Sequence, residues 1–335
     1  MSELHVIFGA GPLGKWTARE LVGMGQRVRV INRSGQADRL PEQVEIVAGD
    51  AYDTNKNIKL TKGAVAIYQC AQPLYQEWAE KFPRLQSAIL QAAETNKAKF
   101  IMADNLYMYG GMHGQPIRED MPYQPHTKKG KIRAQMANAV MDAHRAGKIR
   151  AAIGRASNFF GPDDRAFLTG VAIRSAVLGK TINLLGRMDQ PHTFSYAPDF
   201  GKLLATLGTR ADALGQIWFT PSPAAVTQNE LVKIMEDELG RKVKVLAAGK
   251  AIMGILGLFD PTIRESVEML YEWNQPFIMD SSKAEKAFGW KGATLQQAMK
   301  ETVAWLKEDI EKQKTTLLEK RNVKNVQWSL HSENR

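Results

Sequence analysis

The feature that most constrains the fold is the stretch LHVIFGAGPLG at residues 4–14, where an apolar run ends in the pattern G-x-G-x-x-G. The first glycine permits a tight turn after a strand, the second lets the backbone approach a pyrophosphate, and the third lets the next helix pack closely. The pattern follows a strand and opens a helix, which is the context that a dinucleotide site requires. We therefore expect the phosphates of a dinucleotide at this helix N-terminus. The residues predicted to form the loop are Gly9, Gly11, Pro12, Leu13 and Gly14.

Short apolar strands alternate with helical stretches along the first half of the chain. Such alternation favours a parallel sheet covered by helices on both faces. The sequence therefore predicts an α/β protein, a Rossmann doubly wound parallel sheet with a smaller mixed α/β C-terminal substrate lobe. The expected strands are 4–11, 27–33, 44–50, 64–71, 99–105 and 150–158, and the expected helices are 14–25, 76–96, 129–147, 228–240 and 294–313.

The domain boundaries follow from the point where this alternation weakens, near residue 163. We expect residues 1–162 to form the dinucleotide-binding domain, with 196–220 returning to it. Residues 163–195 and 221–314 are expected to form the substrate-binding lobe, and 315–335 a polar tail.

Charge and composition limit the classes of partner. The chain has 335 residues, a formal net charge of +10 and a single cysteine, Cys70. The cations recur along the whole length without a nucleic-acid-binding motif, which favours an anionic small-molecule substrate over nucleic acid. The apolar run 251–259 is too short to cross a bilayer, so no membrane association is expected. We expect a cytoplasmic protein, with no metal site and with a homodimer as one possible assembly.

The choice of dinucleotide depends on the end of the second strand, which reads VINRSG. An NAD site usually places an acidic residue there to hold the ribose hydroxyls. Here Asn32, Arg33 and Ser34 occupy the zone, and an arginine fork can pair with a 2′-phosphate. The sequence therefore favours NADP(H) over NAD(H).

Further motifs follow in order: GDAYD (49–53), NLYMYGG (105–111), GRASNFFGP (154–162), SYAPDFGKLL (195–204) and FIMDSSKAEKAFGWK (277–291). Together with GAGPLG, they resemble the extended and atypical short-chain dehydrogenase/reductases, the NAD-dependent epimerase/dehydratase group, over roughly residues 4–310.

The resemblance implies further cofactor contacts. Asp50 should meet the adenine edge, and Asn158 should lie at the nicotinamide or substrate edge. Both also have a structural interpretation, because an aspartate can cap a turn and an asparagine can satisfy loop backbone. The resemblance also implies that Ala71, Gln72 and Pro73 border the cofactor after the fourth strand.

The chain departs from this family at its catalytic positions. Members ordinarily carry a serine four residues before Tyr-Gly, and then Tyr-x-x-x-Lys on the next helix. Aligned on Tyr109 and the glycine after it, the serine position holds Asn105. The tyrosine and lysine positions hold Lys129 and Arg133. Because these two cations are four residues apart, they share a helix face, which we expect to look toward the nicotinamide ribose.

These residues retain part of the chemistry. Asn105 can donate a hydrogen bond to a carbonyl oxygen, whereas Arg133 can act only as a fixed charge. Lys129 can serve as an acid if desolvation and the neighbouring arginine lower its pKa. Tyr107, Tyr109 and Tyr123 are alternative acids, of which Tyr107 and Tyr109 flank the aligned strand end.

Three hypotheses remain open at this point. The first is an NADP(H)-dependent oxidoreductase that acts on a small carbonyl or alcohol. The second is a nucleotide-sugar epimerase or dehydratase. The third is a non-catalytic NADP(H)-sensing regulatory protein.

Overall fold

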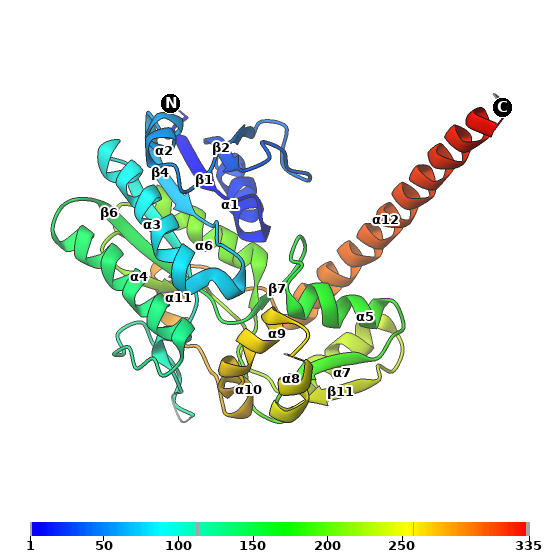
Figure 1. Cartoon of the computed structure of the whole chain (residues 1–335). Helices are drawn as coiled ribbons and strands as arrows, with labels where there is room; N and C mark the ends of the chain where they lie inside the picture. The colour runs from blue at the N-terminus through cyan, green and yellow to red at the C-terminus, as the bar shows by residue number, and fades with distance from the viewer. Residues whose placement is uncertain (1, 112–113, 257, 333–335) are drawn as a thin grey trace.

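The computed structural model describes residues 2–111, 114–256 and 258–332. A seven-stranded sheet has the strand order β10-β6-β5-β4-β1-β2-β3, and its paired strands are all parallel (Figure 1). The order reverses between β1 and β4, which is the doubly wound arrangement of the Rossmann fold. The predicted fold class is therefore confirmed. The strands are β1 (Leu4–Phe8), β2 (Arg27–Asn32), β3 (Glu45–Ala48), β4 (Ala64–Gln69), β5 (Lys99–Asp104), β6 (Arg150–Arg155) and β10 (Ile217–Phe219).

Helices cover both faces of this sheet. On one face lie α1 (Pro12–Gly23) and α6 (Ala197–Thr209), and on the other lie α2 (Thr54–Leu60), α3 (Trp78–Thr95) and α4 (Lys128–Arg145). Because helices cover both faces of the sheet, consecutive residues of β1 are buried, and apolar residues do not alternate with exposed polar ones. The α1 and α6 helices approach closely at Gly201, where a Cβ atom would lie 2.4 Å from the Cβ of Trp16.

Local sequence signals set the starts of the helices that border the site. Pro12 occupies the first turn of α1, where its missing N–H costs no hydrogen bond. Thr127 caps α4 by accepting a hydrogen bond from the backbone N–H of Gly130 at 3.0 Å. Both helices therefore begin at the edge of the sheet where the strands end.

A smaller lobe follows, with its own apolar core. A two-stranded parallel sheet pairs β8 (Ile182–Leu185) with β11 (Val245–Ala248). Around it pack η3 (Phe167–Ile173), α5 (Arg174–Val177), α7 (Gln228–Leu239) and α12 (Leu295–Ser332). The shorter elements are η1 (Tyr75–Glu77), η2 (Tyr107–Tyr109), β7 (Phe159–Phe160), β9 (Ser195–Tyr196), α8 (Lys250–Leu256), α9 (Pro261–Ser266), η4 (Val267–Met269), α10 (Tyr271–Asn274) and α11 (Ser282–Phe288).

The structure adds elements that the sequence pattern did not predict. The α6 helix and the short helices between 250 and 288 were not expected. The last helix was expected to end near residue 313, but the backbone of α12 remains helical to Ser332, through most of the predicted polar tail. The end of that tail, 333–335, lies outside the described residues.

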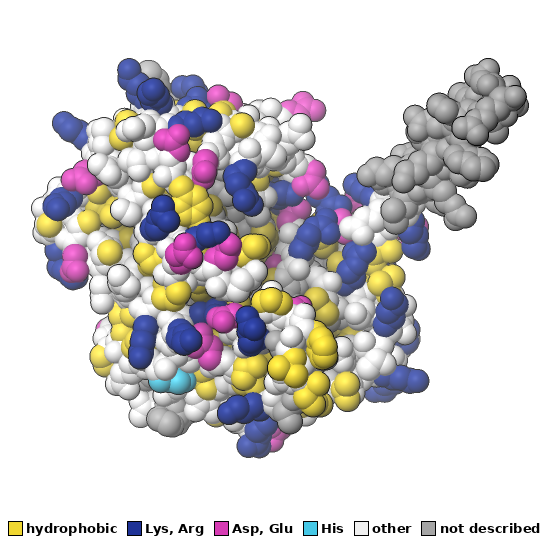
Figure 2. Space-filling view, in the orientation of Figure 1, with side chains coloured by type: hydrophobic (Ala, Val, Ile, Leu, Met, Phe, Trp, Pro, Cys, Tyr) yellow, Lys and Arg dark blue, Asp and Glu magenta, His cyan; other side chains and the backbone are white. Residues whose placement is uncertain are grey.

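The visible surface mixes charges of both signs. Figure 2 shows Lys and Arg side chains spread over this face, with Asp and Glu among them. Over the described ranges, no helix combines the length and the apolar character needed to cross a membrane. In that same part of the chain, no three His, Cys, Asp or Glu side chains gather closely enough to hold a metal ion.

Candidate active site

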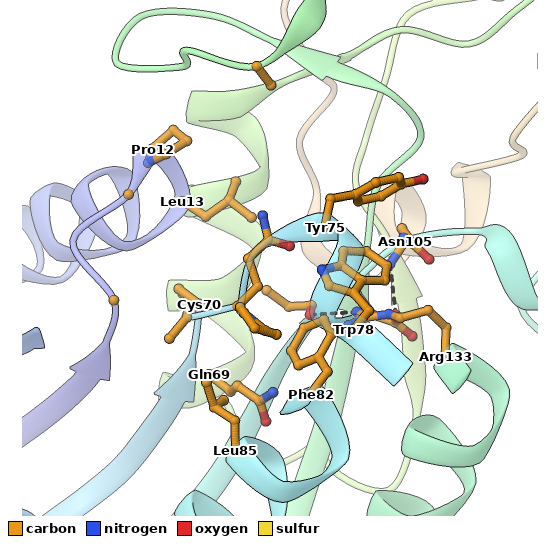
Figure 3. A pocket seen from close by; sticks show the side chains of 18 of the residues that line it. Pro12, Leu13, Gln69, Cys70, Tyr75, Trp78, Phe82, Leu85, Asn105 and Arg133 are labelled. Carbon is orange, nitrogen blue, oxygen red and sulfur yellow. Dashed lines mark hydrogen bonds and ion pairs between the residues drawn. The ribbon is translucent and has the colours of Figure 1, made fainter. Parts of the chain in front are cut away.

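A cleft of about 870 Å³ opens at the carboxyl ends of the sheet strands. Ligands of open α/β sheets bind there, because the reversal of strand order leaves a crevice. Figure 3 shows side chains from the glycine loop, from α3 and from α4 around the cleft. Glu272 and Phe277 add a wall from the C-terminal part of the chain. The cleft therefore joins the dinucleotide-binding loop to the smaller lobe.

The glycine loop forms one end of the cleft. A Cβ atom on Gly9 would lie 2.8 Å from the backbone nitrogen of Ala71, and one on Gly14 would lie 1.9 Å from the carbonyl oxygen of Gly9. By contrast, no atom lies within 4 Å of the place where Gly11 would carry a Cβ. Gly14 thus serves helix packing behind the cleft, while Gly11 leaves open space at the N-terminus of α1. Of the five predicted loop residues, those that line the cleft are Gly9, Gly11, Pro12 and Leu13.

The end of β2 presents a cation to the same cleft. Asn32 and Arg33 line it, whereas Ser34 does not. The Asn32 side chain shapes the loop, because its Oδ1 accepts from the N–H of Gly35 at 2.7 Å and its Nδ2 donates to the carbonyl of Gln36 at 2.8 Å. The Arg33 guanidinium has no hydrogen bond or ion pair with any described residue. It is therefore available to an anionic ligand.

Asp50 also lines the cleft, and its side chain stabilises a turn. Its Oδ1 accepts a hydrogen bond from the backbone N–H of Tyr52 at 3.1 Å. Both interpretations drawn from the sequence are thus compatible with its position. The predicted border residues after the fourth strand, Ala71, Gln72 and Pro73, line the cleft too.

An apolar wall with unsatisfied polar atoms follows along α3. Trp78, Phe82 and Leu85 project one helical turn apart into the cleft (Figure 3). The Nε1 of Trp78 and both amide atoms of Gln69 are buried and lack a hydrogen-bond partner among the described residues. Buried polar groups are normally paired, so these atoms indicate a place for a polar ligand.

A buried charge cluster lies at the end of β5. Asp104 accepts from Nε of Arg133 at 2.7 Å and from Nε of Arg155 at 2.8 Å. All three side chains are at most 4% exposed. Arg133 lines the cleft but is already paired, so it is a fixed charge at the position where relatives carry lysine.

The structure differs from expectation at Lys129, which does not line the cleft. Its ammonium lies 2.5 Å from Glu265 and 3.5 Å from Glu268, over the ring of Tyr75. The hydrogen bond from Lys129 lowers the pKa of Glu265. Two carboxylates therefore draw the ammonium toward α9 and η4, away from the proposed nicotinamide end.

The two candidate tyrosines that flank the strand end take different places. Tyr107 lines the cleft beside Asn105, whose Oδ1 accepts from the backbone N–H of Tyr107 at 3.2 Å. Tyr109 does not line it, because its hydroxyl accepts a hydrogen bond from Arg155 at 2.6 Å inside the core. Burial raises the pKa of both phenols. Of the two, only Tyr107 can meet a ligand in this cleft.

A carboxyl group that the sequence did not predict completes the site. Glu272 lines the cleft, and its Oε2 accepts a hydrogen bond from Nδ2 of Asn158 at 3.1 Å. Asn158 also lies 3.1 Å from Nε2 of His192. Burial raises the pKa of Glu272 to about 8, and the hydrogen bond from Asn158 opposes this rise. No sequence signal marks Glu272, because it meets Asn158 across 114 positions of chain.

Fold and cleft together define a Rossmann protein with a cleft at the carboxyl ends of its parallel strands. The chain belongs to the NAD dependent epimerase/dehydratase family, whose model matches residues 6–218. The family resemblance noted from the motifs is thereby confirmed. No curated protein matches the chain significantly.

Solved structures of the same fold cover nearly the whole chain. UDP-glucuronic acid 4-epimerase from Bacillus cereus, in complex with UDP-glucuronic acid and NAD, is 16% identical, with a TM-score of 0.73 over 91% of this chain and 99% of that one. dTDP-glucose 4,6-dehydratase from Bacillus anthracis, in complex with NAD, is 14% identical, with a TM-score of 0.75 over 92% and 98%. UDP-glucose 4-epimerase from Thermus thermophilus, also with NAD, is 15% identical, with a TM-score of 0.74 over 91% and 99%.

The residues of the cleft fit a nicotinamide dinucleotide. The open space at Gly11 lies at a helix N-terminus, where a pyrophosphate is stabilised by backbone N–H groups and the helix dipole. The unpaired amide of Gln69, the indole N–H of Trp78 and the hydroxyl of Ser157 offer buried polar contacts along the cleft.

Proposed function

We propose that the protein is a nicotinamide-dinucleotide-dependent enzyme of the epimerase or dehydratase type, with a nucleotide sugar as substrate. The observation that carries the proposal is the continuous cleft from Gly11 to Glu272, which has room for a cofactor and a second ligand. The family supports this hypothesis better than direct reduction of a small carbonyl, because its members are named for epimerisation and dehydration. The UDP-glucuronic acid 4-epimerase from Bacillus cereus, which has the same fold, holds UDP-glucuronic acid and NAD.

The proposed cofactor is NADP(H), although the relatives named above hold NAD. The support is Arg33, an exposed guanidinium that lines the cleft and has no partner among the described residues. At the end of β2, Asn32 stands where an NAD site usually carries an acidic side chain to hold a free ribose 2′-hydroxyl. The next acidic residue along the chain, Asp38, is paired with Lys15. The 2′-phosphate would therefore meet a cation rather than a carboxylate.

A bound nicotinamide supplies reversible hydride transfer. The chain's own residues would position the substrate and move its proton. Arg133, fixed by Asp104, would contribute positive charge near the ribose, and Asn105 would donate to the reacting oxygen. Lys129 would have no part in the reaction, because its ammonium is held by two glutamates. Of the acids considered from the sequence, Tyr107 lines the cleft, and Glu272 adds a buried carboxyl group there.

The test is a substrate panel. Protein loaded with NADP⁺ or NAD⁺ is incubated with UDP-glucose, UDP-glucuronic acid and dTDP-glucose, while nicotinamide fluorescence and proton NMR follow transfer and product. We expect reduced nicotinamide and an epimerised or dehydrated sugar with at least one of these probes. Cofactor binding without any transfer would contradict the proposal.

A second candidate, a non-catalytic NADP(H)-sensing protein, is favoured by one observation. The cations at the tyrosine and lysine positions, Lys129 and Arg133, are both held in ion pairs. Tight NADPH binding without turnover, together with a co-purifying protein partner, would support this second candidate.

A further inference from the structure

Glu272 has a carboxyl oxygen that the protein does not satisfy. The side chain is 2% exposed and lines the cleft, and its Oε1 is buried without a hydrogen-bond partner in the part of the chain that the structure describes. Leaving a buried polar oxygen unpaired costs free energy. A ligand in the cleft is therefore the group that can complete its hydrogen bonding.

The opposite side of the carboxyl group is held firmly. Asn158 donates through Nδ2 to Oε2 of Glu272, and the same amide lies within hydrogen-bond distance of Nε2 of His192. Nδ1 of His192 lies 3.2 Å from the backbone oxygen of Glu272, so this nitrogen carries the proton and Nε2 accepts. The imidazole stacks on Trp273 at 4.3 Å and 2°. The carboxyl group is thus fixed through both its side chain and its backbone.

The surroundings keep this group neutral near pH 7. Burial lowers the pKa of His192 to about 3, so the imidazole adds no positive charge. The other titratable groups near the carboxyl are the phenols of Tyr75, Tyr107 and Tyr271, and burial raises the pKa of each. No ion pair to Glu272 occurs among the described residues. A carboxylic acid with an exchangeable proton therefore faces the cleft.

We propose that Glu272 is the acid and base of the reaction, in place of the tyrosine that the family motif would supply. This inference rests on the proposed function. As the substrate alcohol is oxidised, its C–H bond breaks and the hydride reduces the nicotinamide. The O–H bond of the hydroxyl group on that same carbon also breaks, and its proton passes to the Glu272 carboxylate. On the return step, the hydride goes back to the carbonyl carbon and Glu272 returns the proton to the oxygen.

The other candidates suit this role less well. Lys129 and Tyr109 do not line the cleft, and Arg133 keeps its proton. The pKa of Tyr107 is raised by burial and by the nearby Glu272 carboxylate, which moves it further from neutrality. An acid–base group works best when its pKa lies near the working pH, and Glu272 meets that condition.

The experiment compares the wild type, Glu272→Gln and the control Tyr271→Phe, each loaded with NADP⁺ and mixed with the sugar nucleotides UDP-glucose, UDP-glucuronic acid and dTDP-glucose. Tyr271 adjoins Glu272 and has a buried hydroxyl with no described partner, so its variant reports on disturbance of the same segment. We expect Glu272→Gln to slow hydride transfer roughly 10²–10⁴-fold, the usual contribution of a positioned acid–base group. NADPH affinity should stay within threefold in both variants.

A readout independent of turnover is carbon NMR of glutamate-labelled protein without substrate. One carboxyl signal should titrate near pH 8 and be missing from Glu272→Gln. The rate of alcohol oxidation in the wild type should rise through the same pH range, because the carboxylate is the base.

The outcomes separate the two proposals. If Glu272→Gln transfers hydride as fast as Tyr271→Phe, or if Glu272 titrates in the ordinary carboxyl range, this inference is overturned and the proposed function stands. If the wild type binds cofactor but transfers no hydride from any of the three probes, both are overturned.

Discussion

At the scale of single residues, Arg33 is the side chain that decides the proposed cofactor preference. A charge-assisted contact to a 2′-phosphate contributes about 1.5–3 kcal/mol, or roughly 10- to 150-fold in affinity. We therefore expect Arg33→Ala to weaken NADPH binding by that factor and to leave NADH binding nearly unchanged, as measured by calorimetric titration. Equal losses for both cofactors would show that Arg33 does not contact the 2′-phosphate.

The sequence predicts the structural roles of some site residues but not of others. The packing roles of Gly9 and Gly14 could be predicted, because a Cβ at either position would meet backbone atoms. The place of Lys129 could not be predicted, because helical spacing gives its face but not the carboxylates of Glu265 and Glu268 across 136 and 139 positions of chain. Short sequence motifs therefore predict positions that backbone geometry requires. The partners of a side chain depend on which distant segments pack against it.

At the scale of elements, Asp104 joins three parts of the sheet domain. It ends β5 and pairs with Arg133 of α4 and Arg155 of β6, all within the core. Removing its charge would leave two buried guanidinium groups uncompensated. We expect Asp104→Asn to lower the free energy of unfolding by about 3–5 kcal/mol, as for other broken buried ion pairs. Denaturant titration measures this loss.

The matched control for that prediction is Asp120→Asn. Asp120 pairs with Arg118 at the surface, where its side chain is 78% exposed. Exposed pairs contribute about 0–1 kcal/mol, so little change is expected. Similar effects of the two variants would mean that the Asp104 cluster does not hold these elements together.

The arrangement of elements was predicted for the sheet but not for the smaller lobe. Apolar runs between turn residues mark β1 through β6, because buried parallel strands are nearly continuous in their apolar character. The segment that carries α8 through α10 has no such rhythm, and its α9 helix packs against η1, which borders the cleft. Glu272 lies in that segment, which is why sequence reasoning missed it.

At the scale of the whole molecule, buried histidine couples stability to pH. Burial and the charge of Lys99 lower the pKa of His5 to about 4, whereas an unfolded histidine titrates near 6.5. Between these values the unfolded chain binds the proton more readily, so acidification favours unfolding. We expect His5 to lower the free energy of unfolding by a few kcal/mol as the pH falls from about 6.5 to about 4.

The His5→Asn variant isolates that contribution. Asparagine can still accept a hydrogen bond from Tyr68, whose hydroxyl lies 2.7 Å from Nδ1 of His5. The loss of stability on acidification should be smaller in this variant than in the wild type, and His126→Gln, at an exposed position, should behave like the wild type. If the free energy of unfolding falls as steeply with acidification in His5→Asn as in the wild type, His5 is not the cause of the loss.

Binding of a nicotinamide dinucleotide at the glycine loop underlies every function proposed for this protein, and calorimetric titration measures that binding. NADPH is titrated into the wild type and into Gly11→Ala, whose stability is measured in parallel. A Cβ on Gly11 meets no protein atom within 4 Å, so we expect the free energy of unfolding to change by less than about 1 kcal/mol. The same Cβ would enter the space proposed for the pyrophosphate. We therefore expect one-to-one NADPH binding in the wild type and binding at least about tenfold weaker in Gly11→Ala. A wild type that does not bind the cofactor, or a Gly11→Ala variant that binds it equally well, would rule out a dinucleotide site at the glycine loop.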